Sequence, residues 1–238
     1  MHARRSGRRK VVLLTAALVP VLLAWNNVVV PRLPGYPESY VPANVAATAL
    51  VLAAARGSGL SWAELGLHRR GLGAGLRWGG ACAALVAAGL VAGLALPATR
   101  PLFADARAAG TDGGELAYQT LVRIPLGTVV WEEVAFRGVL LAGLARLLPL
   151  RAAVGVSAVV FGLWHVRPTL SAAAANDLSD GLLGPVVAVA VGCLVTAAAG
   201  VLFAWLRLRS GSLLAPLLLH LATNTLGLVA AAAAHRLG

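Results

Sequence analysis

The feature that most constrains this chain is a series of apolar segments that recur along its whole length, separated by short polar stretches. Most of them are long enough to cross a hydrocarbon core of about 30 Å as α-helices, which satisfy their own backbone hydrogen bonds in lipid. The sequence therefore predicts an all-α fold, a polytopic transmembrane helical bundle with about seven spans. We place these spans at residues 11–30, 41–56, 74–96, 118–142, 152–175, 182–206 and 212–234.

The composition agrees with a membrane environment. Of 238 residues, 59% are hydrophobic and 12% are charged, which excludes an ordinary water-soluble domain. No small-residue cleavage site follows the N-terminal basic run, so we expect an uncleaved first span. Cys82 and Cys193 lie inside apolar segments, where a disulfide has no positional support. We expect a basic cytoplasmic N-terminus over residues 1–10 and a single membrane domain over residues 11–238.

The net charge of +11 is distributed unevenly between the connections. Cytoplasmic loops of membrane proteins carry an excess of Lys and Arg. The pattern predicts a cytoplasmic N-terminus in a cell (plasma) membrane, and the bias towards Ala, Arg and Gly is typical of a bacterial protein. The basic loops would contact anionic lipid headgroups, and no nucleic-acid partner is expected. Thirteen of the twenty basic residues then fall on the cytoplasmic side: Arg4, Arg5, Arg8, Arg9, Lys10, Arg56, Arg69, Arg70, Arg77, Arg146, Arg151, Arg207 and Arg209.

The fourth span contains charged residues at membrane depth, namely Glu132, Glu133 and Arg137. A carboxylate at mid-bilayer costs at least ~2.5 kcal/mol, so two adjacent ones require a reason. Glu133 and Arg137 are four residues apart with the acid first, which favours an ion pair on one helix face. The corresponding neighbour of Glu132 is Phe136, so Glu132 must find its partner on another helix. We interpret Glu132 as the residue that takes part in the reaction, as a general base, and the Glu133–Arg137 pair as a structural support that orients it.

Two later spans carry histidines in apolar surroundings. His165 follows Phe161 by four residues in the fifth span, and Asn224 follows His220 by four residues in the seventh. Each pair therefore shares one helix face. A lone histidine in a span is usually a satisfied hydrogen-bonding group, but two histidines, an amide and an unpaired acid on three helices predict a common site. The role of Trp164, beside His165, stays open.

The three motifs are Glu-Glu-x-x-x-Arg at 132–137, Phe-x-x-x-His at 161–165 and His-x-x-x-Asn at 220–224. Their order on successive spans resembles the CAAX protease and bacteriocin-processing family, also called the Abi or type II CAAX prenyl endopeptidase-like family. The resemblance covers residues 118–231, and Glu-Leu-Gly-Leu at 64–67 is similar to a cytoplasmic loop of the same family.

The resemblance implies an intramembrane endopeptidase in which Glu132 activates a water molecule and Asn224 polarises the substrate carbonyl. Its partners would be a peptide or membrane-protein substrate and the lipid bilayer; the oligomeric state is open. The implied catalytic residues are Glu132, His165, His220 and Asn224. The implied supporting residues are Glu133, Arg137 and Phe161.

The cofactor requirement is a separate question. The sequence has no His-Glu-x-x-His helix and no third histidine in the cluster, and asparagine is a poor zinc ligand. We therefore favour a glutamic-type mechanism with no cofactor. Zinc is the alternative, and its ligands would be Glu132, His165 and His220.

Two other functions compete with a peptidase. The same cluster suits a transporter with a proton relay, or a non-catalytic bacteriocin-immunity scaffold that binds a partner. A relay needs polar residues on a path to both membrane faces, whereas the sequence offers one compact cluster. Because His220 lies about two turns from the cytoplasmic end of its span, we expect substrate to enter from the cytoplasm. Whether the substrate is prenylated stays open.

Overall fold

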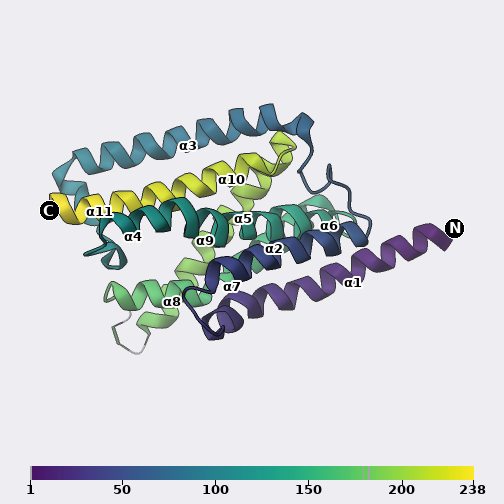
Figure 1. Cartoon of the computed structure of the whole chain (residues 1–238), viewed down its shortest axis with the longest axis horizontal. Coiled ribbons are helices and arrows are strands. Elements are labelled where there is room, and N and C mark those ends of the chain that lie inside the picture. The colour runs from purple at the N-terminus through teal and green to yellow at the C-terminus, as the bar shows by residue number, and fades with distance from the viewer. Residues whose placement is uncertain (1, 179, 182) are drawn as a thin grey trace.

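A computed structural model describes residues 2–178, 180–181 and 183–238. Helices running roughly along one axis account for most of this part of the chain, with the two termini at opposite ends (Figure 1). The longer segments, in chain order, are α1 His2–Ala24, α2 Tyr40–Gly57, α3 Leu72–Ala95, α4 Gly113–Tyr118, α5 Val130–Glu132, α6 Leu141–Ala145, α7 Leu150–Trp164, α8 Val166–Ala175, α9 Gly184–Ser210, α10 Leu214–Leu221 and α11 Gly227–Leu237.

Several of these helices join end to end through wider π-helical turns. The π-helix Gln119–Val129 links α4 to α5, and Glu133–Leu140 links α5 to α6. Ala222–Leu226 links α10 to α11 in the same way. Short 3-10 turns, including Pro97–Phe103 and Ala106–Ala108, form much of the connection between α3 and α4. The predicted spans 118–142 and 212–234 thus each form one continuous helical rod.

The prediction of an all-helical, multi-pass membrane protein is confirmed. In the described chain four helical segments are long and apolar enough to cross a bilayer: Ser6–Arg32, Arg69–Ala95, Gly184–Ser210 and Leu214–Leu237. The pair α7 and α8 makes a fifth if it counts as one span. The predicted spans 41–56 and 118–142 are helical, but they are not among these segments, so the number seven is not confirmed.

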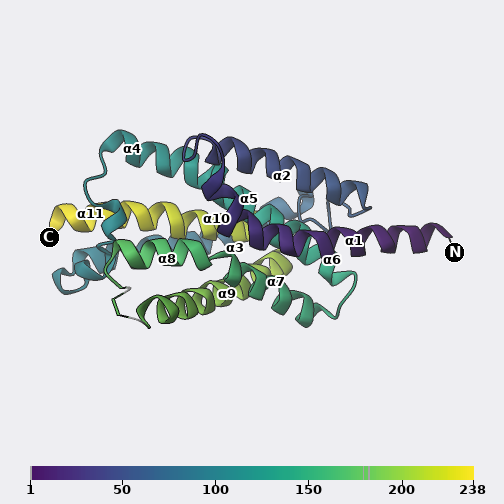
Figure 2. The ribbon, with the colours of Figure 1, turned by 90° about the horizontal axis from the view of Figure 1, so that it is seen from below.

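Successive rods alternate in direction. Figures 1 and 2 show the start of α1, the end of α2, the start of α3 and the end of α6 towards the N-terminal end, whereas the end of α3, the start of α4 and all of α11 lie towards the C-terminal end. The connection between α2 and α3 therefore lies at the N-terminal end of the bundle. The connection between α3 and α4 lies at the opposite end, which we call the C-terminal end of the bundle.

Small residues allow the rods to pack closely. A Cβ atom on Gly162 of α7 would lie 2.6 Å from the carbonyl oxygen of Cys193 on α9. A Cβ atom on Gly79 of α3 would lie 2.8 Å from the carbonyl oxygen of Ala215 on α10. In lipid, helices associate largely through such close van der Waals contact. Both cysteines are free, as expected.

The fifth predicted span is broken between α7 and α8, which meet at an angle of 41°. The break lies at His165, whose φ and ψ are −92° and 9°, three residues before Pro168. Pro168 has no N–H to donate to the carbonyl of Trp164 four residues earlier, and its ring disfavours regular helix just before it. The distortion therefore falls on the turn that precedes the proline.

Two asparagines at the end of the first span satisfy the backbone groups that the break frees. The Asn27 side-chain nitrogen donates to the Leu163 carbonyl at 3.0 Å, and its oxygen accepts from the Arg167 backbone N–H at 2.9 Å. The Asn26 side chain donates to the Trp164 carbonyl at 3.1 Å. A side-chain amide thus takes the place of a helical hydrogen bond, which keeps the break open and exposes His165.

Candidate active site

Glu132 lies in the short segment α5 between two π-helices and is 4% exposed. Its Oε1 atom accepts a hydrogen bond of 3.0 Å from the indole N–H of Trp164. Its Oε2 atom is buried and has no hydrogen-bond partner among the described residues. Wide π turns are common at functional sites, because they change the direction in which neighbouring side chains point. One carboxylate oxygen is therefore held in place, and the other is available.

The two histidines approach the free oxygen of Glu132 from different helices. His165 Nε2 lies 4.0 Å from Glu132 Oε2, and His220 Nε2 lies 3.9 Å from the same atom. These distances exceed a direct hydrogen bond. The structure thus brings together the three residues that sequence analysis placed on separate spans.

The second nitrogen of each ring has its own partner. His165 Nδ1 lies 2.8 Å from the carbonyl oxygen of Phe161, to which it donates as Nδ1–H. His220 Nδ1 lies 2.9 Å from Glu133 Oε1 and donates to that carboxylate. In the neutral form both rings therefore present an unprotonated Nε2 towards Glu132.

Glu133 and Arg137 form the expected ion pair, with 3.0 Å between Arg137 Nη1 and Glu133 Oε1. Both side chains are buried, at 0% and 1% exposure. The Arg137 guanidinium also lies 3.9 Å from the ring centroid of Phe161, a cation–π contact. Because Glu133 contacts Arg137 and His220 through one oxygen atom, the pair orients the imidazole that faces Glu132.

Phe161 is the packing centre of this cluster. Its ring lies edge-on to His165 with 4.6 Å between centroids, and 5.0 Å from Phe136. On the other side, Phe203 of α9 stacks on His220 at 5.0 Å. These contacts restrict the rotation of both imidazoles.

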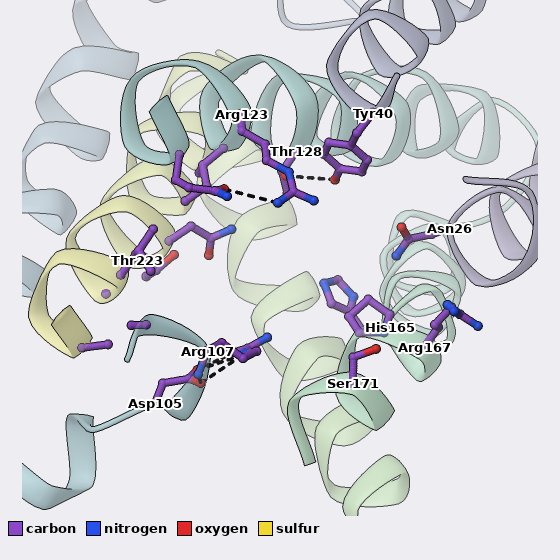
Figure 3. A pocket seen from close by; sticks show the side chains of 18 of the residues that line it. Asn26, Tyr40, Asp105, Arg107, Arg123, Thr128, His165, Arg167, Ser171 and Thr223 are labelled. Carbon is purple, nitrogen blue, oxygen red and sulfur yellow. Dashed lines mark hydrogen bonds and ion pairs between the residues drawn. The ribbon is translucent and has the colours of Figure 1, made fainter. Parts of the chain in front are cut away.

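Asn224 lies four residues after His220, in the π-helix between α10 and α11. It lines a cavity of about 1030 Å³ that Glu132 and His165 also line. The described residues provide no hydrogen bond to its side chain, so the amide is available to a bound molecule. Figure 3 shows His165 at the edge of this cavity, with Arg123, Thr128 and Tyr40 on another side.

The cavity extends towards the C-terminal end of the bundle. Its lining includes Tyr36 from the connection between α1 and α2, and Asp105 and Thr111 from the connection between α3 and α4. Sequence analysis placed both the N-terminus and the entrance for substrate in the cytoplasm. The structure places them at opposite ends of the bundle, so these two expectations cannot both be correct. On the N-terminal side of Glu132 the buried core of the bundle includes Phe136, Leu140, Leu206 and Leu213.

Sequence reasoning missed three residues that shape the site. Trp164 is 1% exposed and holds Glu132, while Asn26 and Asn27 hold the break next to His165. The only local signal was the position of Trp164 beside a motif histidine. The asparagines lie more than a hundred residues away in sequence, and no local pattern connects them to the fifth span.

A metal site would need several His, Cys, Asp or Glu side chains close together. Within the described ranges no group of three His, Cys, Asp or Glu side chains is arranged to hold a metal ion. Glu132 and the two histidines are the nearest approach to such a set, with both Nε2 atoms unprotonated in the neutral rings. The cofactor prediction therefore stays a prediction.

A family model described as Type II CAAX prenyl endopeptidase Rce1-like matches residues 115–226. This region, just under half of the chain, is similar to that family. The match includes all three motifs, and the resemblance inferred from the sequence is confirmed. The Rce1-like region runs from α4 to the end of the π-helix after α10, and it contains every residue of the Glu132 cluster. Comparisons with curated proteins and with solved structures found no match.

Proposed function

We propose that this protein is an intramembrane endopeptidase in which Glu132 activates water for attack on a peptide carbonyl. The observation that carries the proposal is the buried, unpartnered Oε2 of Glu132, which faces two imidazole nitrogens at 3.9 and 4.0 Å and borders a large cavity. The Rce1-like match supports a CAAX-type protease. The glutamic mechanism without a metal is our proposal.

In this mechanism a water molecule lies between Glu132 Oε2 and His165 Nε2. Glu132 removes a proton as the water oxygen attacks the scissile carbonyl, and His165 accepts a hydrogen bond from the same water. The carbonyl becomes a tetrahedral oxyanion. Glu132 then transfers the proton to the departing amine, and the C–N bond breaks to leave a carboxylic acid and an amine. The remaining proton of the water passes from the acid to the amine, which gives a carboxylate and an ammonium ion.

The oxyanion needs hydrogen-bond donors that are already in position. The Asn224 side-chain amide can donate a hydrogen bond whether the neighbouring histidines are neutral or protonated. Since His220 Nδ1–H is directed at Glu133, its Nε2 can donate only when the ring is an imidazolium. The Glu133 carboxylate stabilises that charged ring, so Glu133 supports the site through His220.

The orientation in the membrane follows from charge. We propose seven antiparallel passes in the cell membrane with the N-terminus in the cytoplasm, since the basic connections lie at the N-terminal end of the bundle. The cavity would then open on the extracytoplasmic side. A peptide on that side could reach Glu132 without crossing the bilayer.

The decisive test compares two variants of the purified protein on a panel of fluorogenic peptides. Glu132→Gln should lower the cleavage rate at least ~100-fold, because it removes the proton acceptor. Glu38→Gln, an exposed acid outside the cavity, should cleave at the wild-type rate. Cleavage that survives a chelator supports the metal-free mechanism, whereas loss on chelation and recovery with zinc supports the zinc alternative. Equal cleavage by wild type and Glu132→Gln would disprove the role of Glu132.

A proton relay is the second candidate, and one observation favours it. Arg137 borders a smaller cavity of about 200 Å³ whose lining includes Arg146 and Arg207, on the N-terminal side of the cluster. Polar groups thus approach the two cavities from both ends, with the Glu133–Arg137 pair between them. Proton flux into liposomes that depends on Glu132, with no peptide cleavage, would favour the relay.

A further inference from the structure

Arg123 is a cation on the wall of the cavity. No described carboxylate oxygen lies within 4.0 Å of its guanidinium. Within the described part of the chain, its only polar side-chain contact is a long one of 3.5 Å to Gln119 Oε1. Guanidinium carries five N–H donors, so most of them remain available. In Figure 3 the side chain extends into the cavity on the same side as Tyr40 and Thr128.

The surrounding residues hold Arg123 in this position. Its guanidinium carbon lies 4.9 Å from the ring centroid of Tyr40, a cation–π contact. The Tyr40 hydroxyl is in turn 3.0 Å from the Thr128 hydroxyl. Gly127 allows this arrangement, because a Cβ atom there would lie 2.8 Å from the Tyr40 ring. The cation is therefore oriented before any ligand binds.

The other charged groups that line the cavity already have partners or lie elsewhere on its wall. Asp105 and Arg107 form an ion pair with each other. Glu115 Oε1 accepts a hydrogen bond from Gln119 at 2.6 Å. Glu132 is bound to Trp164, and Arg167 is an exposed residue in the first turn of α8. Among the described lining residues, Arg123 is thus the cation best placed to bind an anion inside the cavity.

We propose that Arg123 binds a carboxylate of the peptide that the Glu132 site cleaves; this rests on the proposed peptidase function. A planar guanidinium pairs with a carboxylate through two parallel hydrogen bonds, which gives both affinity and register. Arg123 precedes Glu132 by nine residues, which is roughly 13 Å at the α-helical rise of ~1.5 Å per residue and somewhat less through the wider π-helical turns up to Val129. An extended peptide covers that distance in about four residues at ~3.3 Å each.

The rest of the lining is of mixed character. Its polar side chains include Tyr36, Thr111 and Ser171, and its apolar ones include Leu102, Phe103 and Leu228. A long hydrocarbon chain alone would leave the hydroxyl, amide and charged groups without hydrogen-bond partners, which is unfavourable. The substrate class is therefore a peptide segment with polar as well as apolar side chains and with a carboxylate about four residues from the scissile bond.

The test measures binding of fluorescent peptides to the Glu132→Gln protein in detergent, so that it does not depend on turnover. One peptide series carries Glu or Gln at two, four or six residues from a fixed central bond. A second series compares a free and an amidated C-terminus at the same distances, which separates a side-chain carboxylate from a terminal one. Arg32→Gln is the matched control, since Arg32 is an exposed arginine outside the cavity lining.

We expect a carboxylate near the fourth residue to tighten binding about tenfold relative to its amide partner. Arg123→Gln should abolish this preference, Arg123→Lys should retain part of it, and Arg32→Gln should leave it unchanged. The same preference should appear in KM with little change in kcat when the wild type cleaves these peptides. Equal binding of acid and amide peptides at any affinity, or a preference that survives Arg123→Gln, would overturn the inference. If the wild-type protein binds these peptides with the expected preference but cleaves none of them, the result would instead count against the proposed peptidase function.

Discussion

At the scale of single residues, the site depends on how each polar atom around Glu132 is occupied. Trp164 holds one oxygen, and the other oxygen faces two imidazoles. Each imidazole is oriented through its Nδ1, by the Phe161 carbonyl in one case and by Glu133 in the other. The hydrogen bonds of these side chains, as much as their residue types, therefore decide which atoms can accept a proton and which can donate a hydrogen bond.

Trp164→Phe should keep the aromatic packing and remove only the indole N–H. Hydrogen bonds to charged groups contribute roughly 1.5–3 kcal/mol, so we expect kcat to fall about tenfold or more while the protein stays folded. Trp78→Phe is a suitable control, because Trp78 packs against Trp205 and lies outside the cluster. An unchanged kcat in Trp164→Phe would mean that Glu132 needs no positioning by the indole.

Glu133→Gln should chiefly reduce stability. The variant leaves Arg137, at 1% exposure, without an anion in the interior, and breaking a buried pair costs about 3–5 kcal/mol. Thermal unfolding in detergent would measure this loss. A variant with the wild-type melting temperature would show that the ion pair does not stabilise the fold, so that Glu133 acts only through its contact with His220.

At the scale of elements, the break between α7 and α8 decides where His165 points. Asn27→Ala should leave the Leu163 carbonyl and the Arg167 N–H without their partner. The expected cost is ~1–3 kcal/mol of stability, with lower activity because His165 loses its position. Thr225→Ala is the control, since that hydroxyl bonds only within its own helix, to Leu221. Wild-type activity and stability in Asn27→Ala would contradict this role.

The connection between α2 and α3 is attached to the bundle by an ion pair. Glu64 pairs with Arg146 at 2.6 Å and accepts hydrogen bonds from the backbone N–H and hydroxyl of Ser61. These contacts, led by the one with Arg146, lower the pKa of Glu64 from 4.5 to about 2. This explains why the Glu-Leu-Gly-Leu sequence at 64–67 is structured.

A lowered carboxyl pKa in the folded state means that the stabilisation is complete above about pH 4.5 and is lost as the pH falls towards 2. Acidification from pH 5 to pH 3 should therefore lower the melting temperature of the wild type. In Glu64→Gln this part of the pH dependence should be smaller. If the melting temperature falls by the same amount between pH 5 and pH 3 in both proteins, the ion pair does not contribute to the stability of the fold. The effect should be modest, because both partners are partly exposed.

At the scale of the whole molecule, the cavity and the basic terminus lie at opposite ends of the bundle. This arrangement predicts the sidedness of labelling by a membrane-impermeant thiol reagent in intact cells, in a background without Cys82 and Cys193. Thr111→Cys, at the cavity, should react from outside, and Ser6→Cys should react only after permeabilisation. The reverse pattern would mean that the charge distribution does not set the orientation of this protein.

Features that depend on local patterns could be predicted from the sequence alone. Long apolar runs predicted helices in a membrane, and four-residue spacing predicted the ion pair between Glu133 and Arg137. The three motifs predicted which spans meet, since buried polar groups in lipid must find partners on neighbouring helices.

Only the tertiary structure decided the direction of the cavity, the partners of each imidazole and the way Trp164 holds Glu132. The Asn26 and Asn27 contacts join residues 138 and 136 positions apart, so no helical periodicity reports them. The side of entry depends on which end of the bundle is filled by packed apolar side chains. That outcome depends on the packing of all the rods together, because the same apolar residue can face lipid, a neighbouring helix or a cavity.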